Sequence, residues 1–591
     1  MSLLLFSMIL KPFFLGLLSW GCVLLALPAF GEISQAVQID HGRLIYLEGK
    51  LPSGNPIIGI RQDIELRGEQ AACVHCHRES GLGGTEGIEI ISPISGPALF
   101  GEKGAVIVEQ LRRFNRSLSA AHLPYDHNTF ATAVRSGENI SGGKLNTLMP
   151  RYQFTDSEID DLMAYLRTLS TNKSPAVNNK EIHIASVITP DVSEANKKAF
   201  IETIQAMVSL HNVNVVSGLR QKISPIERKM QNRRKWRLDI WDLNGPSSTW
   251  QAQLSSLQKN DPAFAILSGL SDNAWQPVQN FCEEKQVACW FPSIETPPSN
   301  ADKSKYSLYF NQGAILDANV IGHQLMKQAS GRVIQIDDGS IAAQVAKETL
   351  HHQMALQHIN TQDFSWDLAN PNALSNTIKN LRPEDTLVLW LHREALNHFT
   401  THFNAPTSSI YYSALLSGHD LTNLNENWTN NSWTVSEIEQ PNLRSANLKR
   451  FRDWMSYYQI PIADEKMQSE VYFAVNSFDW MVSSLLNNFY PRYLVERAES
   501  YLSMYESMQV QDEVQALMMG GESKRPPQNN NANDQIPVAN NVVNRELLFK
   551  RESTSIYPRL SLGIGQRFAS KGAYLIKAKA SSSVDSQWIV P

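Results

Sequence analysis

The chain has 591 residues, which is too many for one hydrophobic core, so two or three domains are expected. Hydrophobic residues make up 42% of the sequence and charged residues 19%, a composition typical of globular protein. The net charge is −5 and no basic tract occurs, which argues against nucleic acid as a partner.

The N-terminal segment has the composition of an export signal. Residues 1–31 contain no acidic residue and one basic residue, Lys11, and the stretch 13–30 is almost wholly apolar. Ala29 and Gly31 place small side chains before a cleavage site. We therefore predict a signal peptide over 1–31, cut after Gly31, and a periplasmic mature protein. The apolar stretch approaches the length that spans a bilayer, so an uncleaved anchor is the alternative and would be the expected membrane attachment.

The sequence Cys73-Val74-His75-Cys76-His77 carries the most specific chemistry in the chain. Cys-x-x-Cys-His is the pattern of c-type haem attachment, in which two thiols bond to the haem vinyl groups and the histidine binds the iron. Two alternatives use the same residue types, a thioredoxin-like dithiol and half of a zinc site. No strand–helix unit leads into the motif and no second cysteine pair lies nearby, so both fit less well.

The residues around this motif have the order of a small haem-binding domain. A glycine-rich loop follows at 81–87, then Met149-Pro150, and a capping box at 155–158 opens a helix with one apolar face. Further helices are predicted at 41–49, 104–116 and 126–137. Over 36–172 this order resembles the class I cytochromes c, which implies an all-α cytochrome c domain.

The resemblance also implies one covalent haem c and a role for each residue that matches the family pattern. Cys73 and Cys76 form the thioether bonds, and His77 is the proximal iron ligand. The carbonyl of Pro97 holds the other ring nitrogen of His77, and Met149 is the sixth ligand. With both axial positions taken, the domain transfers single electrons to a redox partner protein, and the glycine-rich loop is a candidate docking rim.

Other residues of this domain have weaker predictions. Tyr46 is expected to pack against the last helix near Tyr165. His122, His127 and Lys144 lie between the motif and Met149 and are alternative sixth ligands, although each is also an ordinary solvated side chain.

A polar linker is predicted at 173–180, and a second domain over 181–591. Strands and helices alternate there, which favours parallel sheets covered on both faces and, from the number of elements, two lobes with a cleft. Strands are predicted at 180–189, 236–243, 263–269, 288–293, 332–337, 386–391, 409–414, 558–562 and 573–577. Helices are predicted at 193–212, 249–260, 274–286, 312–329, 340–357, 373–381 and 446–458. An Asn- and Pro-rich excursion at 520–544 interrupts the domain.

The pattern predicts strands that run into small or polar turns at 263–269, 288–297 and 332–339. In this the domain resembles the type 1 periplasmic binding proteins, the group that includes the branched-chain amino acid receptors. The resemblance implies an α/β fold of two lobes and a small ligand beyond the strand ends. The candidate ligand-binding residues are Ser271, Ser293, Thr296 and Asp338. Capping and turn formation explain the same residues, since Ser271 and Asp272 precede a helix predicted near Ala274. Tyr309 is the guess for an aromatic residue of the cleft.

Cys282 and Cys289 are the remaining cysteines of the second domain. An oxidising compartment favours a disulfide between them, and two buried thiols are the alternative.

Taken together, the sequence predicts an exported electron carrier fused to a small-molecule-binding or docking module, and favours a non-catalytic carrier over an enzyme. A ligand receptor with a structural or redox-signalling haem is one alternative. A haem enzyme subunit, such as a dehydrogenase or peroxidase partner, is the other, and it would need a vacant iron position or a second cofactor.

Overall fold

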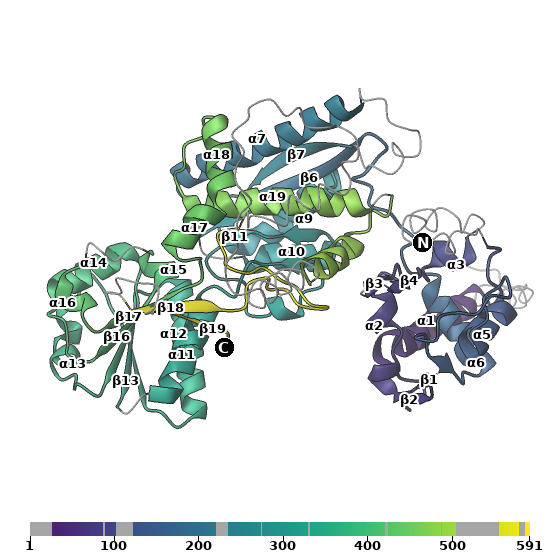
Figure 1. Cartoon of the computed structure of the whole chain (residues 1–591), viewed down its shortest axis with the longest axis horizontal. Coiled ribbons are helices and arrows are strands. Elements are labelled where there is room, and N and C mark those ends of the chain that lie inside the picture. The colour runs from purple at the N-terminus through teal and green to yellow at the C-terminus, as the bar shows by residue number, and fades with distance from the viewer. Residues whose placement is uncertain are drawn as a thin grey trace, which may run out of the picture. The chain divides into compact units, whose positions relative to one another are not determined.

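The computed structural model forms two compact units, residues 1–172 and 173–591, which are treated separately below (Figure 1). The residues it describes are 27–86, 89–101, 122–219, 234–272, 275–328, 331–419, 424–485, 487–503, 555–577 and 586–591. Three predictions fall outside them: most of the export signal, the helix at 104–116 and the excursion at 520–544.

The first unit is built on two helices that cross closely. Its helical segments are α1 Leu27–Arg43, η1 Leu44–Glu48, η2 Gly68–Ala71, α2 Val74–His77, α3 Gly96–Phe100, α5 His127–Ser136 and α6 Asp156–Leu166. At the crossing of α1 and α6, a Cβ on Gly42 would lie 2.0 Å from the carbonyl oxygen of Asp161, so this position requires glycine. One turn later the rings of Tyr46 and Tyr165 contact each other, with centroids 5.4 Å apart. The capping box of α6 is present, because Thr155 and Glu158 bond each other's backbone N–H groups.

The prediction that this unit is all-α is wrong. A small antiparallel sheet is formed by β1 Ile58–Arg61, β2 Ile64–Arg67 and β5 Arg151–Tyr152, and a hairpin by β3 Gly84–Glu86 and β4 Glu89–Ile91. Gln62 and Asp63 both adopt positive φ in the two-residue turn between β1 and β2. Asn-Gly is the usual signal of such a turn, and its absence explains why the segment reads as loop. Part of the predicted glycine-rich loop forms β3.

The first unit ends at Asn172, the last residue of the predicted cytochrome c domain. Helix α1 begins at Leu27, so the helix runs through the predicted cleavage position and the unit begins before residue 36. Within the part of the chain that the structure describes, no helix has both the length and the apolar character needed to cross a membrane. The predicted linker is bound to the second unit, since the N–H of Ser174 donates to the carbonyl of Phe489 (3.0 Å) and Ala176 is buried there.

The second unit contains two parallel sheets with the same strand order. The first sheet consists of β6 Glu181–Ile188, β7 Lys235–Asp242, β8 Ala265–Leu267, β9 Leu270–Ser271, β10 Ala288–Trp290, β11 Ser293–Ile294 and β12 Ser307–Leu308. Strands β8 and β9 continue one another beside β6, and β10 and β11 do the same further out. Counted along the chain, the spatial order is therefore second, first, third, fourth, fifth, which is a doubly wound sheet.

The second sheet repeats this order and adds an antiparallel edge. It consists of β14 Thr361–Ser365, β13 Val333–Asp337, β15 Thr386–Trp390, β16 Ser409–Ser413, β17 Ser432–Ser436, β18 Ala573–Lys577 and β19 Ser586–Ile589, in that spatial order. We call the first sheet and its helices the first lobe, and the second sheet and its helices the second lobe. Between them they confirm the predicted two-lobed α/β architecture.

Helices cover both faces of each sheet (Figure 1). The first lobe has α7 Glu194–Leu219 and α19 Glu465–Leu485 on one face, and α9 Trp250–Asn260 and α10 Gln276–Lys285 on the other. The second lobe has α11 Ala314–Gln328 and α12 Ile341–Leu356 on one face, and α13 Ser375–Lys379, α14 Arg393–His402 and α16 Glu426–Thr429 on the other. The remaining short helices are α15 Ala414–Ser417, α17 Pro441–Asn447 and α18 Lys449–Tyr457. Residues 558–562, predicted as a strand, form none.

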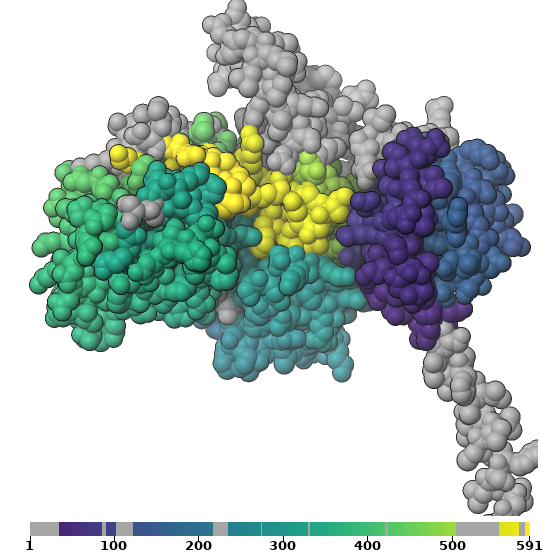
Figure 2. Space-filling view, turned by 90° about the horizontal axis from the view of Figure 1, so that it is seen from below, coloured from purple at the N-terminus to yellow at the C-terminus, as the bar shows by residue number. Residues whose placement is uncertain are grey.

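The chain passes between the two lobes three times. Phe310 belongs to the core of the first lobe and Ala314 to that of the second; the chain returns at Ile438 and crosses again between Ala569 and Ala573. The C-terminal segment (yellow in Figure 2) accordingly lies over both lobes. Three crossings place the carboxyl ends of the strands of both sheets beside the same connecting segments.

Candidate functional sites

The Cys-x-x-Cys-His motif forms a single helical turn. Helix α2 begins directly after Cys73, and the N–H of His77 donates to the carbonyl of Cys73 (2.9 Å). Residues three positions apart on a helical turn share a face, so Cys73 and Cys76 present their thiols together. Neither cysteine takes part in a disulfide. Cys73 and Val74 also pack against the unit's apolar core, so one side of this turn is dry.

The imidazole of His77 is held in one tautomer. Its Nδ1 donates to the carbonyl oxygen of Ser92 (2.9 Å), and since a carbonyl only accepts, Nδ1 must carry the proton. The lone pair then lies on Nε2, the nitrogen free to bind a metal. Burial lowers the pKa of His77 to about 4, which keeps the ring neutral at physiological pH.

Ser92 takes the place that the sequence assigned to Pro97. The reason is local: Pro97 lies in the first turn of α3, where its carbonyl points along the helix, 2.6 Å from where a Cβ on Gly101 would be. A carbonyl held in a helix is not available to an imidazole on another segment. Ser92 follows β4 in a stretch without helical bonds, so its carbonyl is free to accept.

The thiol environment disfavours the two alternative interpretations of the motif. Burial raises the pKa of Cys73 to about 12, whereas a catalytic dithiol requires a lowered thiol pKa. The zinc alternative requires several metal-binding side chains close together. Among the described residues, the group that meets this requirement is His183, Asp239 and Asp261 in the second unit, and it does not include the motif. Both ring nitrogens of His183 already bond protein atoms, at the carbonyl of Pro262 (2.6 Å) and at Asp239 (3.0 Å).

Met149 lies on a turn that leads back to the motif. Its N–H donates to the carbonyl of Asn146 (3.1 Å), and β5 begins two residues later. Tyr152 in β5 donates its hydroxyl proton to the carbonyl of Ala71 (2.7 Å), two residues before the first cysteine. The segment containing Met149 is thus tied to the segment containing Cys73 by a buried hydrogen bond.

The three alternative axial ligands have partners of their own. His127 pairs with Asp160 (2.7 Å) and Lys144 with Glu138 (2.9 Å), while the ring Nδ1 of His122 bonds the carbonyl of Leu123 (2.7 Å). These contacts favour ordinary surface roles for all three.

In the second unit, the four candidate residues differ in what they contact. Ser293 donates its hydroxyl proton to Glu470, and Asp338 accepts from the backbone N–H (2.7 Å) and ring Nδ1 (2.8 Å) of His392, so both already have strong partners. Ser271 is buried within β9. Thr296 is 8% exposed and its hydroxyl has no partner among the described residues, so it is the one of the four best able to bind a ligand.

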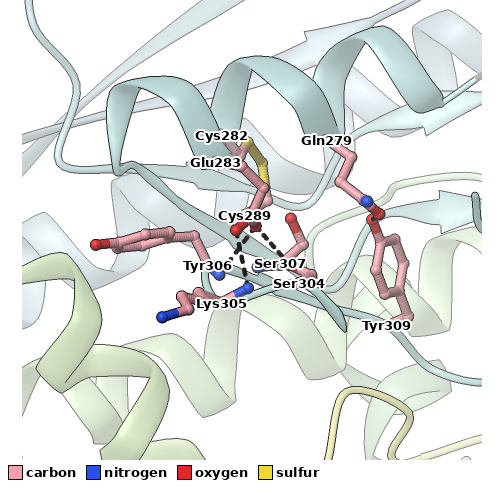
Figure 3. The surroundings of a disulfide bond; sticks show 9 residues. All are labelled: Gln279, Cys282, Glu283, Cys289, Ser304, Lys305, Tyr306, Ser307 and Tyr309. Atoms are coloured by element: carbon pink, nitrogen blue, oxygen red, sulfur yellow. Dashed lines mark hydrogen bonds between the residues drawn. A yellow bond between two sulfur atoms is a disulfide. The ribbon is translucent and has the colours of Figure 1, made fainter. Parts of the chain in front are cut away.

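Two predictions about this region are wrong. Helix α10 begins at Gln276, after Trp275, and no side chain caps it, because the chain is still in β9 at Ser271. Tyr309 does not line the cleft: it is 1% exposed, and its hydroxyl donates to Gln279 (2.7 Å) within the core of the first lobe (Figure 3).

A disulfide joins Cys282 on α10 to Cys289 on β10 (Figure 3). Beside it, Glu283 accepts from the hydroxyl of Ser304 (2.5 Å) and from the backbone N–H groups of Lys305 (2.9 Å) and Tyr306 (3.0 Å). The disulfide and the hydrogen bonds of Glu283 fix α10 and the loop before β12 onto the sheet, away from the carboxyl ends of the strands.

Sequence reasoning missed His392, which stands at the carboxyl end of β15 and joins the two lobes. Its ring contacts Asp338 of the second lobe and Glu295 of the first (3.4 Å). Hydrogen bonds that the ring donates to Asp338 and Glu295 raise the pKa of His392 to about 10, so it carries a positive charge. A histidine directly after a buried apolar strand was the available signal.

Sequence reasoning also missed a buried ionic network on α19. Glu470 is 2% exposed and bonds Lys466 (2.8 Å), Tyr557 and Ser293. These partners come from segments that lie far apart in the sequence.

Comparison with known proteins gives separate results for the two units. Residues 68–170 match the family model of cytochrome c. No curated protein matches the chain.

Among solved structures, the chain is similar to the branched-chain amino acid transporter substrate binding protein LivJ of Streptococcus pneumoniae, with 12% identity, 70% of this chain and 100% of that one covered, and a TM-score of 0.43. It is also similar to a fatty acid ABC transporter substrate-binding protein of Thermomonospora curvata, with 12% identity, 71% and 94% covered, and a TM-score of 0.41. Both resemblances drawn from the sequence are found among these matches.

Proposed function

We propose that this chain is an exported c-type cytochrome with one covalent haem, fused to a module that binds a small molecule. Cys73 and Cys76 would hold the haem through thioether bonds, and His77 and Met149 would bind its iron. Bound haem supplies a reversible one-electron couple, and His/Met ligation raises the reduction potential. Export is supported by the N-terminal composition and by the site of c-type haem attachment, outside the cytoplasmic membrane.

The observation that carries the proposal is the hydrogen bond from His77 to Ser92 within the segment that matches cytochrome c. It orients the ring, fixes the proton on Nδ1 and leaves Nε2 unprotonated beside two cysteines that form no disulfide. The apolar packing of Cys73 and Val74 keeps water from that side of the site. A redox partner protein would exchange the electron at the surface of this unit.

The test uses the full chain, expressed with its own N-terminus in a host that matures c-type cytochromes. Absorption spectra in both redox states should show a low-spin haem, and acidified organic solvent should leave the colour on the protein. Colour that leaves with the solvent, or a protein without haem, would overturn the proposal. Reduced protein should bind carbon monoxide poorly; ready binding would favour the haem enzyme alternative.

A receptor role for the second unit is favoured by its two doubly wound sheets and by the hydroxyl of Thr296, which has no partner among the described residues. Small ligands bind beyond the carboxyl ends of such strands. Binding of a small molecule should therefore raise the thermal midpoint of the second unit within the full chain.

A further inference from the structure

Glu437 is a buried carboxylate without a hydrogen-bond donor. It directly follows β17, on the second crossing between the lobes, and is 2% exposed. Among the described residues, no donor reaches either of its two side-chain oxygens. A buried carboxylate without a donor is unfavourable, so this position calls for a partner that the described residues do not provide.

The charged groups near Glu437 do not fill this role. Lys466 is engaged by Glu470 at 2.8 Å, and although burial opposes it, the charges of Glu470 and Glu437 raise the pKa of Lys466. Asp317, at the start of α11, is 1% exposed and accepts from the hydroxyl of Ser413 (2.6 Å). Burial and the charge of Glu437 raise the pKa of Asp317 well above its usual range, which favours the neutral form of Asp317.

A second group of acids lies at the strand ends of the first lobe. Burial raises the pKa of Asp272 to about 6, with further contributions from Glu295, Asp191 and Asp464. One side-chain oxygen of Asp191 is buried and has no partner among the described residues. Asp464 connects the two groups, because its charge acts on Asp272 and also on Lys466. Carboxylates thus dominate both groups, one beside the second crossing and one at the strand ends of the first lobe.

The cations near these acids are few. His392 is bound by Asp338 and Glu295, and Lys466 by Glu470. Arg444 on α17 is half-buried, and its charge acts on His419 and Glu439 at the edge of the region. A ligand with a carboxylate would meet mostly like charges here, whereas a ligand with protonated amines would complement both groups.

From this arrangement we infer that the region between the lobes takes a small organic cation with more than one protonated amine, anchored by the carboxylate of Glu437. An ammonium group donates up to three hydrogen bonds, which would satisfy both oxygens of Glu437 and leave the second amine for the acids around Asp272. A bare metal ion fits less well, since the described side chains do not bring Glu437 into a group of three or more ligands. The inference rests on the proposed ligand-binding role of the second unit.

The test is calorimetric titration of the full haem-loaded chain with four probes: putrescine, butanediol, succinate and leucine. The first three share one carbon chain and differ in charge, so they separate charge from size. Putrescine should bind, while butanediol and succinate should not. Glu437→Gln should weaken putrescine binding by about tenfold or more, because it removes a charge-assisted bond, and Asp272→Asn should weaken it less. Asp317→Asn is the matched control and should bind putrescine like the native chain, because that side chain is already neutral.

The outcomes separate this inference from the proposed function. Putrescine binding that Glu437→Gln leaves unchanged, in a variant with the native circular dichroism and haem spectra, would overturn the inference. Succinate or leucine binding without putrescine binding would overturn it too, but would support the small-molecule role of the unit. No binding of any probe would overturn the inference and leave the ligand-binding role without support.

Discussion

The ring Nδ1 of His77 donates to the carbonyl oxygen of Ser92 at 2.9 Å, across fifteen positions of sequence. This bond sets which nitrogen of His77 is available to iron, and it is made by backbone, so side-chain substitution at Ser92 preserves it. Met149, the second iron ligand that we propose, is therefore the more informative residue to replace.

Replacing Met149 by Ala should abolish the far-red charge-transfer band that ferric haem shows under His/Met ligation. The variant should also bind carbon monoxide readily when reduced, because an axial position is vacated. Leu148→Ala is the matched control, since Leu148 is its exposed neighbour and should leave the band unchanged. A band that survives in Met149→Ala would contradict the assignment of the sixth ligand.

The two motif cysteines should be separable from the two of the disulfide. Cys73→Ser with Cys76→Ser should give protein whose haem is lost to acidified organic solvent, because no thioether is formed. Cys282→Ser with Cys289→Ser should retain covalent haem. The second double variant loses a crosslink between residues seven positions apart, which should lower the free energy of unfolding by about 2–3 kcal/mol in urea denaturation. An unchanged urea midpoint would show that the crosslink does not stabilise the unit.

Replacing Glu470 by Gln should destabilise the second unit by roughly 3 kcal/mol, because Lys466 would be left without its ionic partner in a largely buried site. Glu465→Gln is the control on the same helix. It removes a more exposed pair with Arg452 and should cost less than about 1 kcal/mol. Thermal unfolding of the second unit measures the stability loss in both variants. Equal losses would show that burial of the network does not add to its stabilising effect.

The His392 contacts should make stability fall at alkaline pH. Because the folded pKa of His392 is raised from its ordinary value near 6.5 to about 10, its contribution is fully present below pH 6.5 and is lost as the pH rises through 10. The side chain is about one-third exposed, so solvent screening limits the effect to roughly 1–2 kcal/mol. Thermal midpoints measured from pH 6 to 10 should fall in the native chain and be flatter in His392→Gln. A His398→Gln control, on the exposed face of α14, should retain the native slope.

The sequence by itself determined the elements whose signals are local. The Cys-x-x-Cys-His spacing, the capping box at Thr155 and the alternation of apolar strands with amphipathic helices all act within a few residues, so pattern alone predicts them. The short strands β1 and β2 were missed because their turn, Gln62-Asp63, lacks the residues that usually announce a hairpin.

The tertiary structure alone decided which groups meet. His77 finds Ser92 rather than Pro97 because a helical turn directs the carbonyl of Pro97 elsewhere. Chain crossings between the two lobes bring together Glu437, Lys466 and Asp317. Their spacing in the sequence does not indicate that they lie close to one another. Burial and charge proximity depend on packing between distant segments, so the carboxylate on which the ligand inference rests could be recognised only in the folded chain.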